Sequence, residues 1–91
     1  MSSMYDKIIN KDGDIVKFKY IENYRRIGLK ISYYRKLNGL TQEQLAEKVN
    51  KSAGFIGAVE ATNVDRAISL DTLFDIAEVL DVPPYKFLTD D

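Results

Sequence analysis

The chain has 91 residues, of which 45% are hydrophobic and 30% charged, so it fits one small globular domain and is too short for a second. It contains no cysteine and no histidine, which excludes disulfides and thiolate metal sites and removes the commonest acid–base side chain. We therefore expect neither an enzyme nor a protein that holds a metal or other cofactor.

The charge is distributed unevenly along the chain. Residues 1–51 contain 11 Lys or Arg and 6 Asp or Glu, a balance of +5, whereas residues 52–91 contain 2 and 8, a balance of −6. Asp71, Asp75 and Glu78 follow helical spacing and indicate a solvated acidic face, which is compatible with nucleic acid bound on another side. No apolar run approaches the roughly 18 residues of a membrane span and no secretion signal is present, so we expect a cytoplasmic protein without a membrane partner.

Residues 1–22 predict a short β-hairpin or an extended N-terminal arm. Apolar residues alternate with lysines from Val16 to Tyr20, and Asp12-Gly13 is a strong signal for a two-residue turn. Such a turn would pair Ile9 with Val16. Because a lone hairpin is marginal in water, its apolar face should pack on the helices or on a second copy of the chain.

Residues 23–91 predict a helical domain, whose first helix begins near Tyr24 and ends at Asn38-Gly39. Its buried stripe comprises Ile27, Ile31, Tyr34 and Leu37. A capping box of Thr41 and Gln44 then opens a second helix of about eight residues.

A third helix follows the second after a break at Asn50-Lys51. Asn suits a left-handed turn, and Ser52 is a good cap for a helix that extends to about Ala61. Two short helices joined by about three residues form the helix-turn-helix pattern.

The longest linker separates this pattern from two further predicted helices. Ser69 caps the fourth helix, and Pro83-Pro84 suit the first turn of a fifth. The fourth helix has an apolar stripe of Leu70, Leu73, Ile76, Ala77 and Leu80. Tyr85, Phe87 and Leu88 would close the bundle.

Residues 27–88 resemble a known family, through the segments IGLKISYYRKLNGLTQEQLAEKVNKSAGFIGAVE and SLDTLFDIAEVLDVPPYKFL. They are similar to the Cro/C1-type helix-turn-helix domains of phage repressors and of the xenobiotic-response-element class of bacterial regulators. The resemblance implies an all-α, five-helix, lambda-repressor-like bundle that regulates transcription, as a repressor. It also implies a homodimer on double-stranded DNA with the third helix in the major groove.

The resemblance also implies roles for particular residues. Gln42, at the start of the second helix, would meet a phosphate, and Ser52 would cap the third helix and touch backbone or base. Asn63 and Arg66 in the linker would contact further phosphates. The positions facing base edges would be Ala53, Gly54, Gly57 and Ala58. Arg35 and Glu60 match a partly buried structural ion pair.

The third helix is unusual because its expected outward face carries almost no polar side chain. At 100° per residue, Ile56 and Val59 define the buried side, whereas Gly54, Gly57, Ala58 and Ala61 face outward. These residues lack the paired hydrogen-bonding groups that distinguish base pairs. Either the helix enters DNA with its backbone close to the groove and reads shape, or the small face docks another protein and the chain is an interaction module derived from a DNA binder. Neither interpretation includes a small-molecule ligand.

Overall fold

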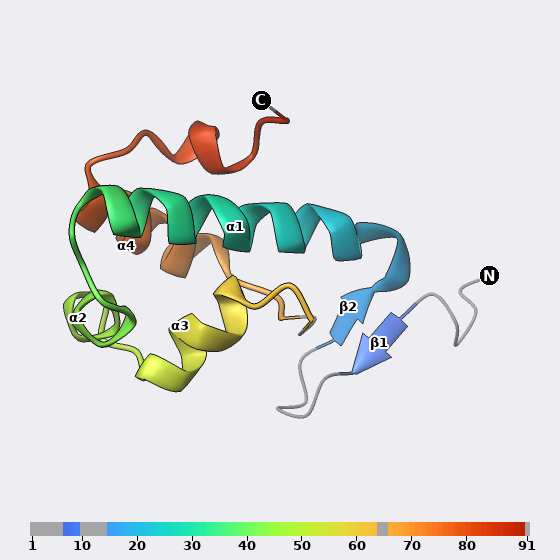
Figure 1. Ribbon diagram of the computed structural model, residues 1–91. Coiled ribbons are helices and arrows are strands. Elements are labelled where there is room, and N and C mark those ends of the chain that lie inside the picture. Colours follow the sequence, from blue (N-terminus) through green and yellow to red (C-terminus); the bar gives the residue numbers. More distant parts are fainter. Residues whose placement is uncertain (1–6, 10–14, 64–65, 91) are drawn as a thin grey trace.

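A computed structural model of the chain describes residues 7–9, 15–63 and 66–90. Two short strands, β1 (Lys7–Ile9) and β2 (Ile15–Lys17), precede a 3-10 turn, η2 (Phe18–Tyr20), and the long helix α1 (Ile21–Leu37). Three further helices follow: α2 (Gln42–Lys48), α3 (Ala53–Glu60) and α4 (Leu70–Leu80). A final 3-10 turn, η3 (Pro84–Phe87), comes before the C-terminus. In Figure 1, α2 and α3 lie on one side of α1 and η3 lies on the other.

The two strands pair in a register that differs from the predicted one. Ile9 pairs with Ile15 and Ile8 with Val16 in an antiparallel ladder, so the predicted pairing of Ile9 with Val16 is wrong by one residue. A two-residue turn leaves an even number of residues between any two paired residues of the hairpin. Ile9 and Ile15 are separated by an odd number, residues 10–14, so this register does not fit a two-residue turn. The expected Asp12-Gly13 turn itself lies outside the described residues.

The start of α1 also differs from the prediction. The helix begins at Ile21, three residues before Tyr24, and Tyr20 precedes it without a capping hydrogen bond from its side chain. The alternation from Val16 to Tyr20 predicted a strand throughout, but Phe18–Tyr20 form the 3-10 turn that leads into the helix. Because Ile21 is buried, packing rather than a capping residue accounts for the helix start.

The helix starts predicted from capping residues are confirmed. Thr41 and Gln44 form the capping box of α2, and the hydroxyls of Ser52 and Ser69 accept the N–H groups of Phe55 and Thr72. Each of these bonds satisfies an amide that the helix itself leaves unpaired. Asn50 has a φ of 56°, the left-handed conformation expected for the break between α2 and α3.

The predicted fifth α-helix is wrong. Within residues 7–9, 15–63 and 66–90 there are four α-helices, and Pro84–Phe87 form only a four-residue 3-10 turn. Two consecutive prolines supply no backbone N–H, and the turn is held by bonds from Lys86 to Pro83 and from Leu88 to Tyr85. Its function in the fold is to bury Phe87, which is 1% exposed.

One hydrophobic core joins the four helices and η3. The buried side chains that form it are Ile31, Leu45, Ala46, Val49, Ile56, Val59, Leu73, Ile76, Ala77, Leu80 and Phe87. Leu45, Ala46 and Val49 from α2 and its cap supply part of this core, and Ile56 and Val59 anchor α3 in it. Four residues of the predicted α4 stripe also belong to it, whereas the fifth, Leu70, is 60% exposed. Among the described residues, no helix combines the length and the apolar character that a membrane crossing requires.

Gly28 is the point at which α1 crosses the end of α3. A Cβ atom built at position 28 would overlap the backbone carbonyl oxygen of Val59. Only glycine allows the two helices this close approach, because a carbonyl group in a helix has no freedom to rotate away. Position 28 therefore fixes how α3 sits against α1.

We expect Gly28→Ala to lower the free energy of unfolding by about 1 to 3 kcal/mol, the usual penalty of overpacking. Gly54→Ala is the matched control, since the nearest atom to its added Cβ would be Ser52 Oγ at 3.9 Å. This second change should stabilise α3 by about 1 kcal/mol. Urea unfolding of both variants measures the difference, and equal stabilities would contradict the close approach at Gly28.

Candidate nucleic-acid interface

The α2 and α3 helices meet as a helix-turn-helix. The left-handed Asn50 reverses the chain, and the Lys51 N–H donates to the Ala46 carbonyl at 2.9 Å. Ser52 then starts α3 in a new direction, with its hydroxyl 3.0 Å from the Phe55 nitrogen. The turn is therefore held by backbone and capping bonds at both of its ends.

The small residues of α3 are more exposed than Ile56 and Val59, but only Gly54 is exposed and Gly57 is half-buried. Ile56 is 0% and Val59 5% exposed, whereas Gly54 is exposed and Ala53 and Ala58 are half-buried. The helix ends at Glu60, one residue before the predicted end, and Ala61 continues with an extended backbone. The outward face of α3 thus consists of backbone, glycine and alanine methyl groups.

Gln42 covers part of this face. Its side chain extends from the first turn of α2 toward α3, so that a Cβ at Gly57 would lie 3.4 Å from Gln42 Oε1. The amide Nε2 donates to Glu60 Oε1 at 3.1 Å. Gln42 therefore links the two helices of the motif, and Gly57 provides the space for it.

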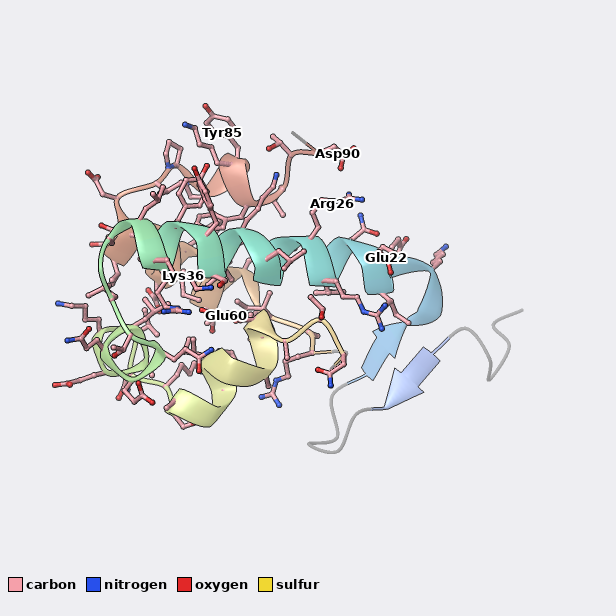
Figure 2. All side chains as sticks on the ribbon, viewed as in Figure 1. Glu22, Arg26, Lys36, Glu60, Tyr85 and Asp90 are labelled. Atoms are coloured by element: carbon pink, nitrogen blue, oxygen red, sulfur yellow. The ribbon has the colours of Figure 1, made fainter. Side chains whose placement is uncertain are left out.

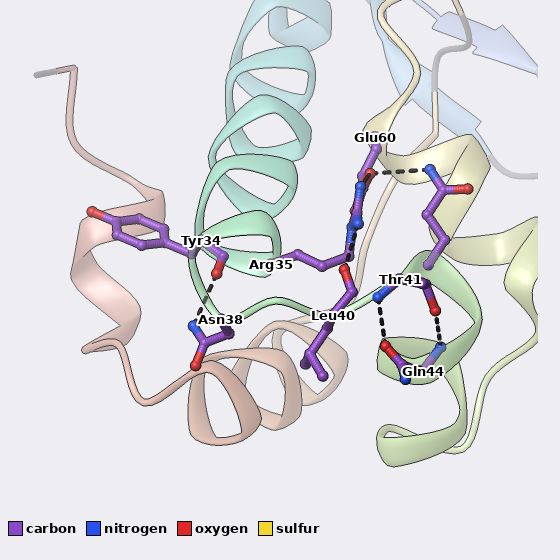
Figure 3. Close-up of polar contacts among 8 residues, drawn as sticks. Tyr34, Arg35, Asn38, Leu40, Thr41, Gln44 and Glu60 are labelled. Carbon is purple, nitrogen blue, oxygen red and sulfur yellow. Dashed lines mark hydrogen bonds and ion pairs between the residues drawn. The ribbon is translucent and has the colours of Figure 1, made fainter.

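A buried ion pair holds α3 to α1. Arg35 Nε donates to Glu60 Oε2 at 2.7 Å and Arg35 Nη2 to Glu60 Oε1 at 2.9 Å, an arrangement with two parallel bonds (Figure 3). Arg35 Nη1 also donates to the Leu40 carbonyl at 2.7 Å. The two side chains are only 9% and 5% exposed, and Figure 2 shows Glu60 between α1 and α3.

The electrostatics of this pair follow from its hydrogen bonds. The bond to the Glu60 carboxylate raises the pKa of the Arg35 guanidinium above its ordinary value, against the opposing effect of burial. Arg35 therefore stays charged, and its N–H groups reach a carboxylate on α3 and a carbonyl in the α1–α2 loop. One side chain thus connects three segments of the chain.

The remaining predicted site residues flank α3. Asn63 is exposed in the linker that follows the helix. Arg66, from the same linker, is half-buried and its guanidinium lies 5.0 Å from the centre of the Phe55 ring. Ser52 caps the helix, and Ala53 and Gly54 belong to its first turn.

Sequence reasoning missed a second cation beside this turn. Lys51 Nζ lies 5.4 Å from the centre of the Phe55 ring. The sequence signal nearest to it is the adjacent Ser52 cap. On the sequence alone, Lys51 belongs only to the break between the helices, and an apolar side chain such as Phe55 does not by itself indicate a contact with a cation.

Two other cations of α1, Arg26 and Lys30, contact the C-terminal segment and not α3. Arg26 forms an ion pair with Asp90 at 2.6 Å, and Lys30 donates to the Thr89 carbonyl. These contacts tie the C-terminal segment to α1, on the side away from Glu60 (Figure 2). In the part of the chain that the structure describes, no three His, Cys, Asp or Glu side chains gather as metal ligands would.

Comparison with known proteins agrees with this geometry. A family model described as Helix-turn-helix matches residues 31–87. The control protein C.SmaI of Serratia marcescens is 41% identical over 56 residues, covering 62% of this chain and 64% of the control protein. The chain thus matches less than two thirds of that relative's length.

Two solved structures share the fold. The restriction-modification controller protein C.AhdI from Aeromonas hydrophila has a TM-score of 0.66 and 27% identity, covering 72% of this chain and 97% of the controller. SinR, a master regulator for biofilm formation solved in complex with DNA, has a TM-score of 0.64 and 32% identity, covering 69% of this chain and 98% of the SinR chain in that structure.

We expect Arg35→Ala to lower the free energy of unfolding by about 3 to 5 kcal/mol, because it leaves the buried Glu60 carboxylate without its partner. Arg26→Ala is the matched control, since Arg26 is exposed and pairs with the exposed Asp90 at 2.6 Å on the surface of α1. Its loss should change stability by about 1 kcal/mol at most. Thermal melting compares the two, and a melting temperature for Arg35→Ala within a degree or two of wild type would contradict the structural role.

Proposed function

Because the chain belongs to the Cro/C1-type helix-turn-helix family, a family of DNA-binding transcription regulators and not of enzymes, we propose that it binds double-stranded DNA and represses transcription. In this proposal α3 enters the major groove. The observation that carries it is the position of α3: its first turn carries the exposed Gly54, while Ile56, Val59 and Glu60 fix the helix to the bundle. The similarity to SinR, solved with DNA, supports the same use of the helix. A bacterial regulator of this kind acts in the cytoplasm, where the DNA lies.

The bare surface of α3 determines how it would read DNA. Gly54 has open space around it, so the helix backbone could approach the base edges more closely than a helix with long side chains. The Ala53 and Ala58 methyl groups suit apolar contact with thymine methyl groups. Most sequence preference would then come from DNA shape and from the placement of phosphate contacts.

Phosphate contacts would come from the groups that flank α3. Arg66 supplies a charge, and Asn63 is an exposed amide in the same linker. Ser52 uses its oxygen as the helix cap, which leaves the hydroxyl hydrogen to donate to a phosphate. Gln42 gives one N–H of its amide to Glu60, and the second N–H can donate to a phosphate.

We further propose that two copies bind one operator. A single α3 of eight residues reaches only a few base pairs, and two-fold dimers of this fold class read half-sites one helical turn apart. Several large apolar side chains are exposed on α1, α4 and the C-terminal segment, including Tyr33 at 58% and Leu70 at 60%, so surface for self-association is present. Titration of a duplex with the chain, read by sedimentation, would give two chains per duplex.

Gel shifts of generic and own-promoter duplexes at several salt concentrations test DNA binding. We expect affinity to fall with salt at a log–log slope of about −0.9 for each phosphate neutralised. Arg66→Ala should weaken binding to all duplexes and reduce the slope by about one contact. Lys86→Ala is the matched control, because this exposed lysine lies on η3, on the other side of α1. Absence of duplex binding at low salt would contradict the proposal.

Gly54→Gln tests which face of α3 meets the DNA. The new side chain has free space, and an amide can form two hydrogen bonds with adenine, so discrimination between duplexes that differ at one base pair should rise about tenfold. Gly54→Ala is the control for helix stability alone. If Gly54→Gln leaves DNA binding unchanged but abolishes binding of a protein partner, the small face is a protein-docking surface and the alternative function holds.

A further inference from the structure

The recognition helix has no cation of its own. The only charged residue of α3, AGFIGAVE, is Glu60, and its carboxylate is taken up by Arg35 and Gln42. The side chains of α3 thus provide no electrostatic attraction to the phosphates of DNA. Positive charge close to α3 must therefore come from other segments.

Two cations from outside the helix meet on the ring of Phe55. Lys51 Nζ, from the turn before α3, lies 5.4 Å from the ring centre, and the Arg66 guanidinium carbon, from the linker after α3, lies 5.0 Å from it. Both distances are within the range of about 6 Å in which an aromatic ring attracts a cation. The segments before and after α3 thus place two positive charges beside one turn of the helix.

Phe55 is held rigidly enough to act as a platform. Its backbone N–H is bonded to the Ser52 hydroxyl at 3.0 Å, which fixes it in the first turn. Its side chain is half-buried and packs against the hydrophobic core, so the ring cannot follow the cations into solvent. Lys51 itself is exposed, and without a partner its long side chain would sample many rotamers.

We propose that Phe55 is a positioning residue for DNA binding, which holds the Lys51 ammonium and the Arg66 guanidinium as a pair of phosphate contacts at the start of α3. This rests on the proposed function and adds Lys51 to its DNA contacts. Each cation–ring contact at an exposed site favours the ordered side chain by about two- to fivefold. The pair supplies the electrostatic attraction that α3 lacks, and the phosphates in turn relieve the repulsion between the two cations.

The test compares Phe55→Leu, which keeps an apolar side chain but removes the ring, with Phe55→Tyr, which keeps the ring. With an own-promoter duplex at low salt, we expect Phe55→Leu to weaken binding about tenfold and Phe55→Tyr to stay within about twofold of wild type. In a Lys51→Gln/Arg66→Gln background, Phe55→Leu should change affinity by less than about twofold, because the groups through which the ring acts are gone.

A second measurement uses the free protein and does not depend on DNA. Protons held over an aromatic ring are shifted upfield in NMR spectra, so the Lys51 Hε and Arg66 Hδ signals of wild type should be shifted and those of Phe55→Leu should not. If Phe55→Leu is unfolded at the assay temperature, Phe55→Met takes its place, and the wild-type shifts decide whether the ring holds the cations.

The outcomes separate this inference from the proposed function. If wild type binds no duplex, both fail. If wild type binds in a salt-dependent way but Phe55→Leu binds equally well, or weakens binding as much in the Lys51→Gln/Arg66→Gln background as in wild type, only the role of Phe55 fails. Absence of the upfield shifts in wild type also overturns it.

Discussion

The buried ion pair of Arg35 and Glu60 is the contact on which the arrangement of α3 depends. An isolated helix of eight residues with two glycines has almost no stability in water, so tertiary contacts must hold it. The pair fixes its C-terminal end to α1 and, through the Leu40 carbonyl, to the loop that enters α2. The carboxylate accepts a further bond from Gln42, so both helices of the helix-turn-helix are joined at one charged group.

The other end of α3 is held differently. The Ser52 cap and the Phe55 ring fix the first turn, while Gly28 allows the last turn to touch α1. With both ends held and with Ile56 and Val59 buried in the core, the outward face of the helix needs no side chain to keep the helix in place. This permits glycine and alanine at the surface, where longer side chains would read bases in a more typical helix of this kind.

The helix α3 and the positive charges beside it thus come from different segments of the chain. The outward face of α3 consists of backbone and small side chains. The positive charge beside it comes from Lys51 and Arg66. The cations Arg26 and Lys30 instead hold the C-terminal segment on α1. A net charge of −1 is thus compatible with binding of a polyanion, because what matters is which charges lie beside the helix.

The amino-acid sequence alone determined the features that depend on neighbouring residues. Thr41, Ser52 and Ser69 mark helix starts and Asn50 marks the turn, because capping and left-handed backbone are properties of a few adjacent residues. The tertiary structure alone decided that α1 begins at Ile21, that the strands pair one residue away from the expected register, and that Pro84–Phe87 form only a 3-10 turn. It also decided that Gly28 lies against Val59 and that two cations meet on Phe55. The contact of Gly28 with Val59 joins two helices that are separate in the chain, and the other features depend on which side chains meet in space. Periodicity and capping signals carry no information about such contacts.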